Sequence, residues 1–158
     1  LVRSRGLGDV YKRQDDSFAL VSSRHPVAVD WAEVSRVLAP GGSYLAQHVG
    51  PASAFELVEE FLGPQPTEIR SRRDPEVEAS EARAAGLDVV DLRTERLRIE
   101  FYDVGAIVWF LRKVIWLVPG FDSASHRERL QSLHERLQEG PFVAHSSRTL
   151  IEARKPRR

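Results

Sequence analysis

Two short polar stretches near the start of the chain carry the side chains best suited to chemistry. The first is Ser22-Ser-Arg-His25, which follows an apolar run, and the second is Gln47-His48-Val-Gly50. In open α/β sheets, ligands bind beyond the carboxyl ends of the strands, where polar groups sit on a rigid scaffold. His25 is the best candidate for a general base, because an imidazole titrates near neutral pH.

Arg24 and His25, both in the first stretch, also have structural explanations. His25 could have a structural role alone, in which it caps the end of a strand or hydrogen-bonds a backbone carbonyl. The catalytic and the structural role both stay open. Arg24 could attract an anionic acceptor, or it could pair with Asp15 or Asp16. We favour the ion pair.

A predicted strand, helix and strand position these stretches. Phe18–Val21 is a continuous apolar run, which is typical of a parallel strand buried on both faces, and a loop is expected over 22–26. Asp30 can cap a helix that Pro40-Gly41-Gly42 ends. The apolar positions of that helix fall on one face: Trp31, Val34, Val37 and Leu38. With a second strand over Ser43–Val49, the segment predicts one βαβ unit with a right-handed crossover.

The motifs of this segment occur in a fixed order, Asp15-Asp-Ser-Phe-x-Leu-Val-x-Ser-x-His25 and then Glu33-Val-x-Arg-Val-Leu-x-Pro-Gly-Gly42. Together they resemble the fourth strand, the following helix and the turn into strand five of class I S-adenosylmethionine-dependent methyltransferases. Further motifs resemble one subgroup of that family: Phe101-Tyr-Asp-x-Gly-Ala-x-Val108, Trp116-x-x-Pro-x-Phe121 and His145-Ser-x-Arg148. The resemblance covers Asp15 to about Lys155.

The resemblance implies an α/β fold, the C-terminal half of a doubly wound, Rossmann-like methyltransferase sheet. It implies strands 4, 5, 6 and 7 with flanking helices, and a last strand that is antiparallel and inserts between strands five and six. Sequence patterns predict the later elements as helices over 54–62, 74–85 and 103–118, a helix capped by Ser123 or Ser125 and ended by Gly140, strands over 88–101 and 142–154, and an exposed loop over 65–73.

Residues Leu1–Gln14 have no helical or strand periodicity, and they resemble translated sequencing-adapter read-through. We therefore expect a non-native tail at 1–14, a partial methyltransferase domain at 15–155 and a basic tail at 156–158. Only six residues separate Gly8 from Asp15, too few for the strand, helix and strand that lie between a glycine-rich cofactor loop and its ribose-binding acid. We expect the glycine-rich motif to be missing and the fragment to be inactive alone.

The resemblance implies methyl transfer from S-adenosylmethionine to an unidentified small-molecule acceptor. Displacement at a sulfonium needs in-line alignment and, for some acceptors, a base. The residues implied at the site are His25 as the base; Ser22, Ser23 and Arg24 beside the cofactor; and Gln47, His48 and Tyr102 beside the acceptor. Because neighbours on a strand point to opposite faces, only one of Gln47 and His48 is expected to contact the acceptor. Trp109, Trp116 and Phe121 could also line its pocket, although core packing is favoured for Trp109.

Composition excludes several other classes of protein. The chain has 23 basic and 23 acidic side chains, so no bulk field recruits nucleic acid or an anionic membrane. It has no cysteine for a disulfide, a thiolate zinc site or a nucleophile, and its histidines lack metal-ligand spacing. Arg112 and Lys113 interrupt the most apolar segment, which is too short for a membrane helix, and a cytoplasmic location is expected.

Two other functions remain as alternatives. One is a non-catalytic α/β interaction domain. The other is a phosphate- or nucleotide-binding domain, which would need a glycine loop with a lysine, and none is visible. A physical consequence also follows from the expected truncation: the strand at Phe18–Val21 would have a bare edge, and the fragment should be poorly soluble or self-associating.

Overall fold

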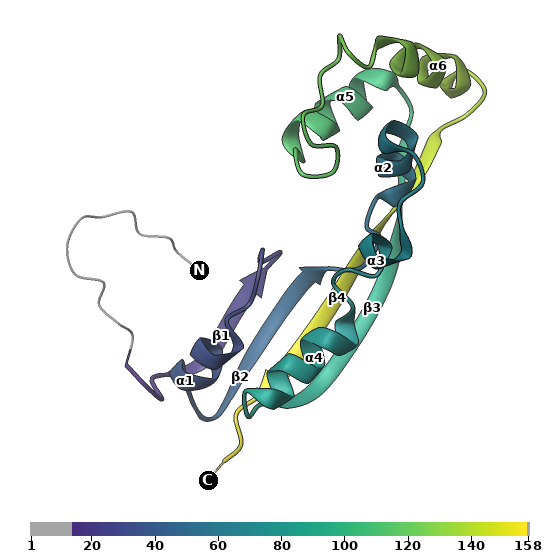
Figure 1. Ribbon diagram of the computed structural model, residues 1–158. Helices are drawn as coiled ribbons and strands as arrows, with labels where there is room; N and C mark the ends of the chain where they lie inside the picture. Colours follow the sequence, from purple (N-terminus) through teal and green to yellow (C-terminus); the bar gives the residue numbers. More distant parts are fainter. Residues whose placement is uncertain (1–13, 158) are drawn as a thin grey trace, which may run out of the picture. The chain divides into compact units, whose positions relative to one another are not determined.

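The computed structural model describes residues 14–157, so the expected tail at 1–14 lies outside it apart from Gln14. The elements in chain order are β1 Phe18–Arg24, α1 Trp31–Val37, β2 Leu38–Val49, α2 Phe55–Leu62, α3 Thr67–Arg70, α4 Pro75–Ala84, β3 Asp88–Phe101, α5 Val104–Lys113, α6 Arg127–Leu137 and β4 Phe142–Arg154 (Figure 1).

The four strands form one mixed sheet in the order β1-β2-β4-β3. β1 and β2 are parallel, with Leu20 opposite Ser43 and Ser22 opposite Leu45. β2 and β4 are antiparallel, so the last strand lies between β2 and β3. This order and these directions confirm the predicted half-sheet with an inserted, antiparallel last strand.

The described residues divide into two compact units. The first contains residues 14–50, 73–95 and 148–157, and the second contains residues 51–72 and 96–147.

In the first unit, α1 and α4 lie over one face of the strands (Figure 1). Burial alternates along β2, where Gly42, Tyr44, Ala46 and His48 are buried while the residues between them are not. This alternation is typical of a strand with one covered face. The core of the unit combines side chains from both helices and the sheet: Trp31, Leu38, Tyr44, Ala46, Ala82, Leu87, Ile151 and Ala153.

Side-chain caps define where the two helices of this unit begin. Asp30 accepts a hydrogen bond from the backbone N–H of Glu33 at 3.0 Å, and Asp74 accepts one from Glu76 at 2.9 Å, as their types and positions predict. Gly86, just past α4, has a φ of +83°, which glycine adopts without steric cost.

The start of β2 and the burial of β1 differ from the sequence predictions. Leu38 begins β2 rather than ending the helix, because it pairs with Phe18 across an irregularity in the register. Gly41, with a φ of +79°, lies within that irregular start. The expectation that β1 is buried on both faces is wrong, since Leu20 is 57% exposed.

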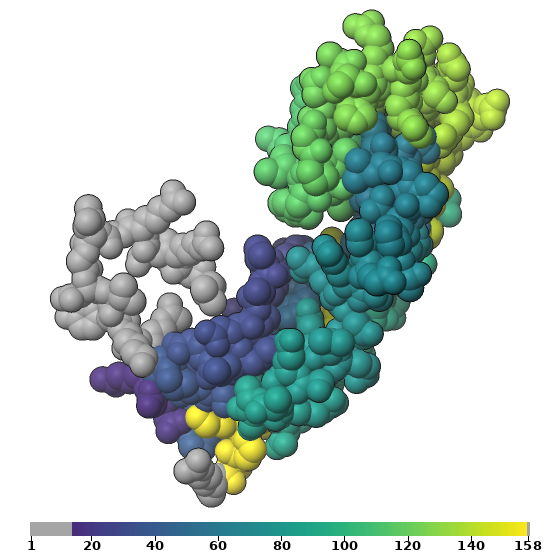
Figure 2. Space-filling model, viewed as in Figure 1, coloured from purple at the N-terminus to yellow at the C-terminus, as the bar shows by residue number. Residues whose placement is uncertain are grey.

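The second unit contains α2, α3, α5 and α6. In Figure 2, α5 and α6 (green) pack closely against each other. Their buried residues join those of α2 and the sheet in one core: Leu57, Phe61, Phe101, Ile107, Leu111, Val118, Leu133, Leu137 and Ala144. Asp103 caps α5 by accepting a hydrogen bond from the backbone N–H of Ala106 at 2.8 Å.

Three predictions in this unit are wrong in detail. α5 ends at Lys113, and turns rather than helix lead to Pro119. His126, not a serine, precedes α6, because Asp122 already accepts hydrogen bonds from the backbone N–H and hydroxyl of Ser125. The short helix α3 occupies part of the segment expected to be a loop. Within residues 14–157, no helix combines the length and apolar character that a bilayer span requires.

Candidate functional site

The first polar stretch continues β1 instead of forming a loop. The strand runs to Arg24 because each residue from Leu20 onward pairs with β2, ending with Arg24 opposite Gln47. Side chains alternate along it, so Ser22 and Arg24 are exposed while Ser23 is half-buried. The two exposed side chains therefore lie on the face of the sheet that α1 and α4 do not cover.

His25 is the first residue beyond β1 and has an uncommon backbone conformation. Its φ is +50°, in the left-handed region that few residues other than glycine adopt. Its backbone N–H donates to the carbonyl oxygen of Gln47 at 2.7 Å, which holds the turn at the end of β2. The backbone of His25 thus has the structural role considered above, while its side chain is exposed.

Burial and two nearby arginines act on the imidazole of His25. Burial, followed by the charges of Arg148 and Arg24, lowers the pKa of His25, although a hydrogen bond with the Gln47 side chain opposes the shift. A lowered pKa keeps the ring neutral at neutral pH, and only the neutral ring can accept a proton.

Strand register places three of these side chains on one face. Arg24 lies opposite Gln47, Gln47 lies opposite Leu150, and Arg148 is two residues from Leu150 along β4. Directly paired residues, and residues two apart on one strand, point to the same side of a sheet. Arg24, Gln47 and Arg148 therefore share the face opposite the core of the first unit.

His48 occupies the other face, where it is 1% exposed. Its Nε2 lies 3.1 Å from Tyr44 Oη, and its Nδ1 lies 2.5 Å from Glu78 Oε2 of α4. Gln47 and His48 therefore point to opposite faces, as expected for neighbours on a strand, and His48 is the buried one. Contact of Gln47 with an acceptor stays a prediction.

Tyr44 is the buried end of this hydrogen-bonded chain. Burial raises the pKa of Tyr44 to about 12, while a hydrogen bond from the Ser23 side chain opposes the shift. Tyr44 and Glu78 were missed by sequence reasoning. The even spacing of Tyr44 and His48 on a strand could have shown that they share a face, but no sequence signal indicated Glu78 on a separate helix.

The expected ion pair of Arg24 is wrong. Asp15 forms an ion pair with Arg36, and Asp16 with Lys155 at 2.6 Å. Both acids therefore help to fasten the start of β1 to other parts of the first unit.

Tyr102 belongs to the second unit, just past β3, and is 68% exposed. Its hydroxyl hydrogen-bonds Glu100, and this bond raises the pKa of Tyr102. Trp109 and Trp116 are 63% and 69% exposed, so core packing is wrong for Trp109. Phe121 packs edge-on against Phe61 with ring centroids 5.5 Å apart.

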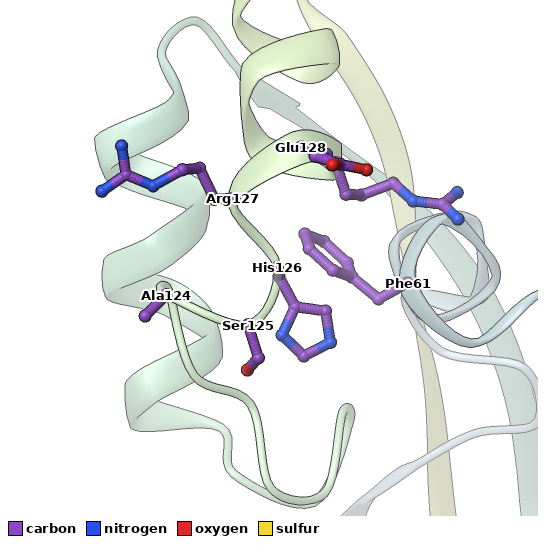
Figure 3. Close-up of a pocket in the computed structure, with 7 residues that line it drawn as sticks. Phe61, Ala124, Ser125, His126, Arg127 and Glu128 are labelled. Atoms are coloured by element: carbon purple, nitrogen blue, oxygen red, sulfur yellow. The ribbon is translucent and has the colours of Figure 1, made fainter.

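The second unit also has a surface hollow of about 550 Å³ between Phe61 and residues 124–129 (Figure 3). His126 lies in it, stacked on Phe121 at 5.3 Å between centroids and hydrogen-bonded through Nδ1 to the carbonyl oxygen of Asp122 at 2.8 Å. These contacts give His126 a packing role. Residues 14–157 contain no cluster of side chains able to hold a metal ion.

The fold matches part of known methyltransferases. No protein-family model and no curated protein matches the chain. Among solved structures, it is similar to a putative methyltransferase from Bacillus halodurans C-125, with a TM-score of 0.55 and 18% identity over 90% of this chain and 66% of the other. It is also similar to the YcgJ protein from Bacillus subtilis, with a TM-score of 0.50 and 19% identity over 91% of this chain and 66% of the other.

The chain spans just under two thirds of the length of these two proteins. The described residues therefore have part of the class I methyltransferase fold, with its antiparallel last strand.

Proposed function

We propose that the protein to which this chain belongs transfers a methyl group from S-adenosylmethionine to a small-molecule acceptor. The observation that carries the proposal is the placement of His25, next to Gln47, at the carboxyl ends of two parallel strands in part of a methyltransferase fold. In open α/β sheets this edge is where ligands bind.

The described residues fit one side of such a site. When bound, S-adenosylmethionine supplies an electrophilic methyl group on a sulfonium. Ser22 is exposed near the end of β1 and could border its amino-acid portion, whereas Ser23 is half-buried beside Tyr44. The glycine-rich loop of dinucleotide-type folds follows the first strand of the complete sheet, and residues 14–157 contain no such loop. We therefore propose that this chain does not bind the methyl donor by itself.

In this proposal, residues of the described chain take up a proton from the acceptor and orient the side chain that does so. His25, neutral at neutral pH, accepts a proton from the acceptor as its nucleophilic atom is methylated. Gln47, which shares a hydrogen bond with His25, holds the imidazole in one orientation. The strained turn at His25 fixes the ring at the strand end, as backbone strain at functional sites often does.

Isothermal titration tests the proposal on a protein that includes the reading frame upstream of Asp15. We expect S-adenosylmethionine and S-adenosylhomocysteine to bind that protein, and we expect residues 1–158 alone not to turn over. His25→Gln should keep donor binding and lose most transfer, whereas His134→Gln, an exposed histidine on α6, should lose neither. Failure of the longer protein to bind the donor would favour a non-catalytic interaction domain instead.

A further inference from the structure

Two arginines and a histidine lie at one edge of the first unit, where Arg24 and His25 are exposed and Arg148 is half-buried. Arg24 ends β1, His25 follows it, and Arg148 lies opposite Val49 at the end of β2. The paired positions put Arg24 and Arg148 on the same face as Gln47. Arg24, Gln47 and Arg148 come from three neighbouring strands, so their spacing is set by the sheet.

The charges of Arg24 and Arg148 act on His25 and on each other. Each charged neighbour that shifts the pKa of His25 is a cation or a histidine: Arg148, Arg24 and His48. Burial, followed by the charge of Arg24, lowers the pKa of Arg148. Asp15 and Asp16, the acids nearest to Arg24 in the sequence, pair with Arg36 and Lys155. A bound anion would be attracted to Arg24 and would favour the charged ring of His25.

We propose that this edge binds the anionic group of the methyl acceptor, a carboxylate or a phosphate. Guanidinium groups donate paired N–H bonds that match either group, and Arg24 is exposed where it can do so. His25, next to Arg24, then faces the nucleophilic atom of the same molecule. This inference rests on the proposed function, since it names the acceptor class of that site.

NMR titration of the imidazole protons of residues 1–158 tests the anion site without any donor. The His25 signal is assigned by its loss in His25→Gln, and its midpoint pH is followed with sodium phosphate, sodium acetate or sodium chloride at equal ionic strength. We expect phosphate or acetate to raise the midpoint of His25, because a bound anion favours the charged ring. Whichever of phosphate and acetate raises the midpoint of His25 more identifies the preferred anionic group.

Three variants sharpen the test. Arg24→Gln should raise the midpoint of His25 in chloride, since a positive neighbour is lost, and should weaken anion binding about tenfold. Arg24→Lys keeps the charge, so it should leave the midpoint in chloride near the parent value while weakening anion binding. Arg83→Gln removes an exposed guanidinium on α4 and should change neither quantity.

Equal midpoints for His25 in phosphate, acetate and chloride would overturn the inference, as would equal effects of Arg24→Gln and Arg83→Gln on anion affinity. The result is separable from the proposed function. Anion binding by residues 1–158, together with no donor binding by the longer protein, would keep the anion site and remove its assignment to a methyl acceptor.

Discussion

His48 Nδ1 lies 2.5 Å from Glu78 Oε2, and this contact joins the C-terminal end of β2 to α4 inside the first unit. Because His48 is 1% exposed, both ring nitrogens need partners, and Tyr44 Oη provides the second at 3.1 Å. The carboxylate favours a proton on Nδ1, which leaves Nε2 to accept from the Tyr44 hydroxyl. Since Gln47 adjoins His48, the same chain fixes the strand that carries the candidate site.

Replacement of Glu78 tests how much this chain stabilises the first unit. Glu78→Ala leaves Nδ1 of a buried imidazole without its partner, so we expect a loss of about 1–3 kcal/mol in the free energy of unfolding. Glu78→Gln retains an acceptor and should lose less. Urea unfolding at pH 7 measures both changes. Glu81→Ala removes an exposed carboxylate from the same helix and serves as the control; a loss as large as that of Glu78→Ala would show that the contact contributes nothing of its own.

The raised pKa of Tyr44 predicts that the folded protein loses stability at alkaline pH. Its pKa rises from 10.0 to about 12 on folding, because burial disfavours the phenolate. The folded state therefore holds this proton more tightly than the unfolded state does. The resulting stabilisation is fully present below pH 10, and it is lost as pH rises through about 12, up to about 3 kcal/mol.

Tyr44→Phe isolates this contribution from other groups that titrate at high pH. Between pH 9 and 12, the free energy of unfolding from urea melts should fall more steeply in the parent than in Tyr44→Phe. Tyr102→Phe serves as a comparison at an exposed site, where solvent screens the hydrogen bond with Glu100, so it should change the slope less than Tyr44→Phe does. Parallel curves for the parent and Tyr44→Phe would contradict the prediction.

Elements specified by local signals could be predicted from the sequence. β3 and β4 have the expected bounds, Asp88–Phe101 and Phe142–Arg154, because alternating side chains and flanking turn residues mark both ends. Asp74 and Asp103 cap the helices that they precede, since capping depends on residues within one turn.

Features that depend on distant partners could not be predicted. Ser22 to Arg24 extend β1 only because β2 offers pairing positions, and a run of small and polar residues gave no sign of this. Glu78 reaches His48 from 30 residues away, through the packing of α4. Trp109 follows the apolar pattern of α5, yet it is exposed, because the position of a helix on its unit decides which apolar residues are covered.

β1 lies at one edge of the described sheet, and its exposed apolar side chains predict self-association. Leu20 is 57% exposed, and Leu45, on the same face of β2, is 41% exposed. An unpaired apolar edge can pair with another chain. We expect residues 1–158 to form oligomers whose average mass increases with concentration in analytical ultracentrifugation. Leu20→Lys should reduce this association, since a lysine at a strand edge opposes pairing.

A control substitution separates the edge from a general effect of charge. Val27→Lys adds the same charge at a side chain that is 92% exposed beyond the strand, and it should leave the association unchanged. A monodisperse parent monomer with a sharp calorimetric transition would rule out this role for the edge.

β1 and β2 approach closely at Gly42, so a side chain at this position should reduce stability. A Cβ at this position would lie 2.9 Å from the carbonyl oxygens of Phe18 and Ala39, and both are backbone atoms. Gly42→Ala should therefore force the two strands apart and cost about 1–3 kcal/mol in the free energy of unfolding. Urea melts at pH 7 measure the loss. Gly140→Ala is the control, because a Cβ there meets no atom within 4 Å, and its stability should equal or slightly exceed that of the parent. If Gly42→Ala were as stable as Gly140→Ala, the close pairing at the start of the parallel strands would be wrong, and with it the positions of Arg24, His25 and Gln47 that depend on their register.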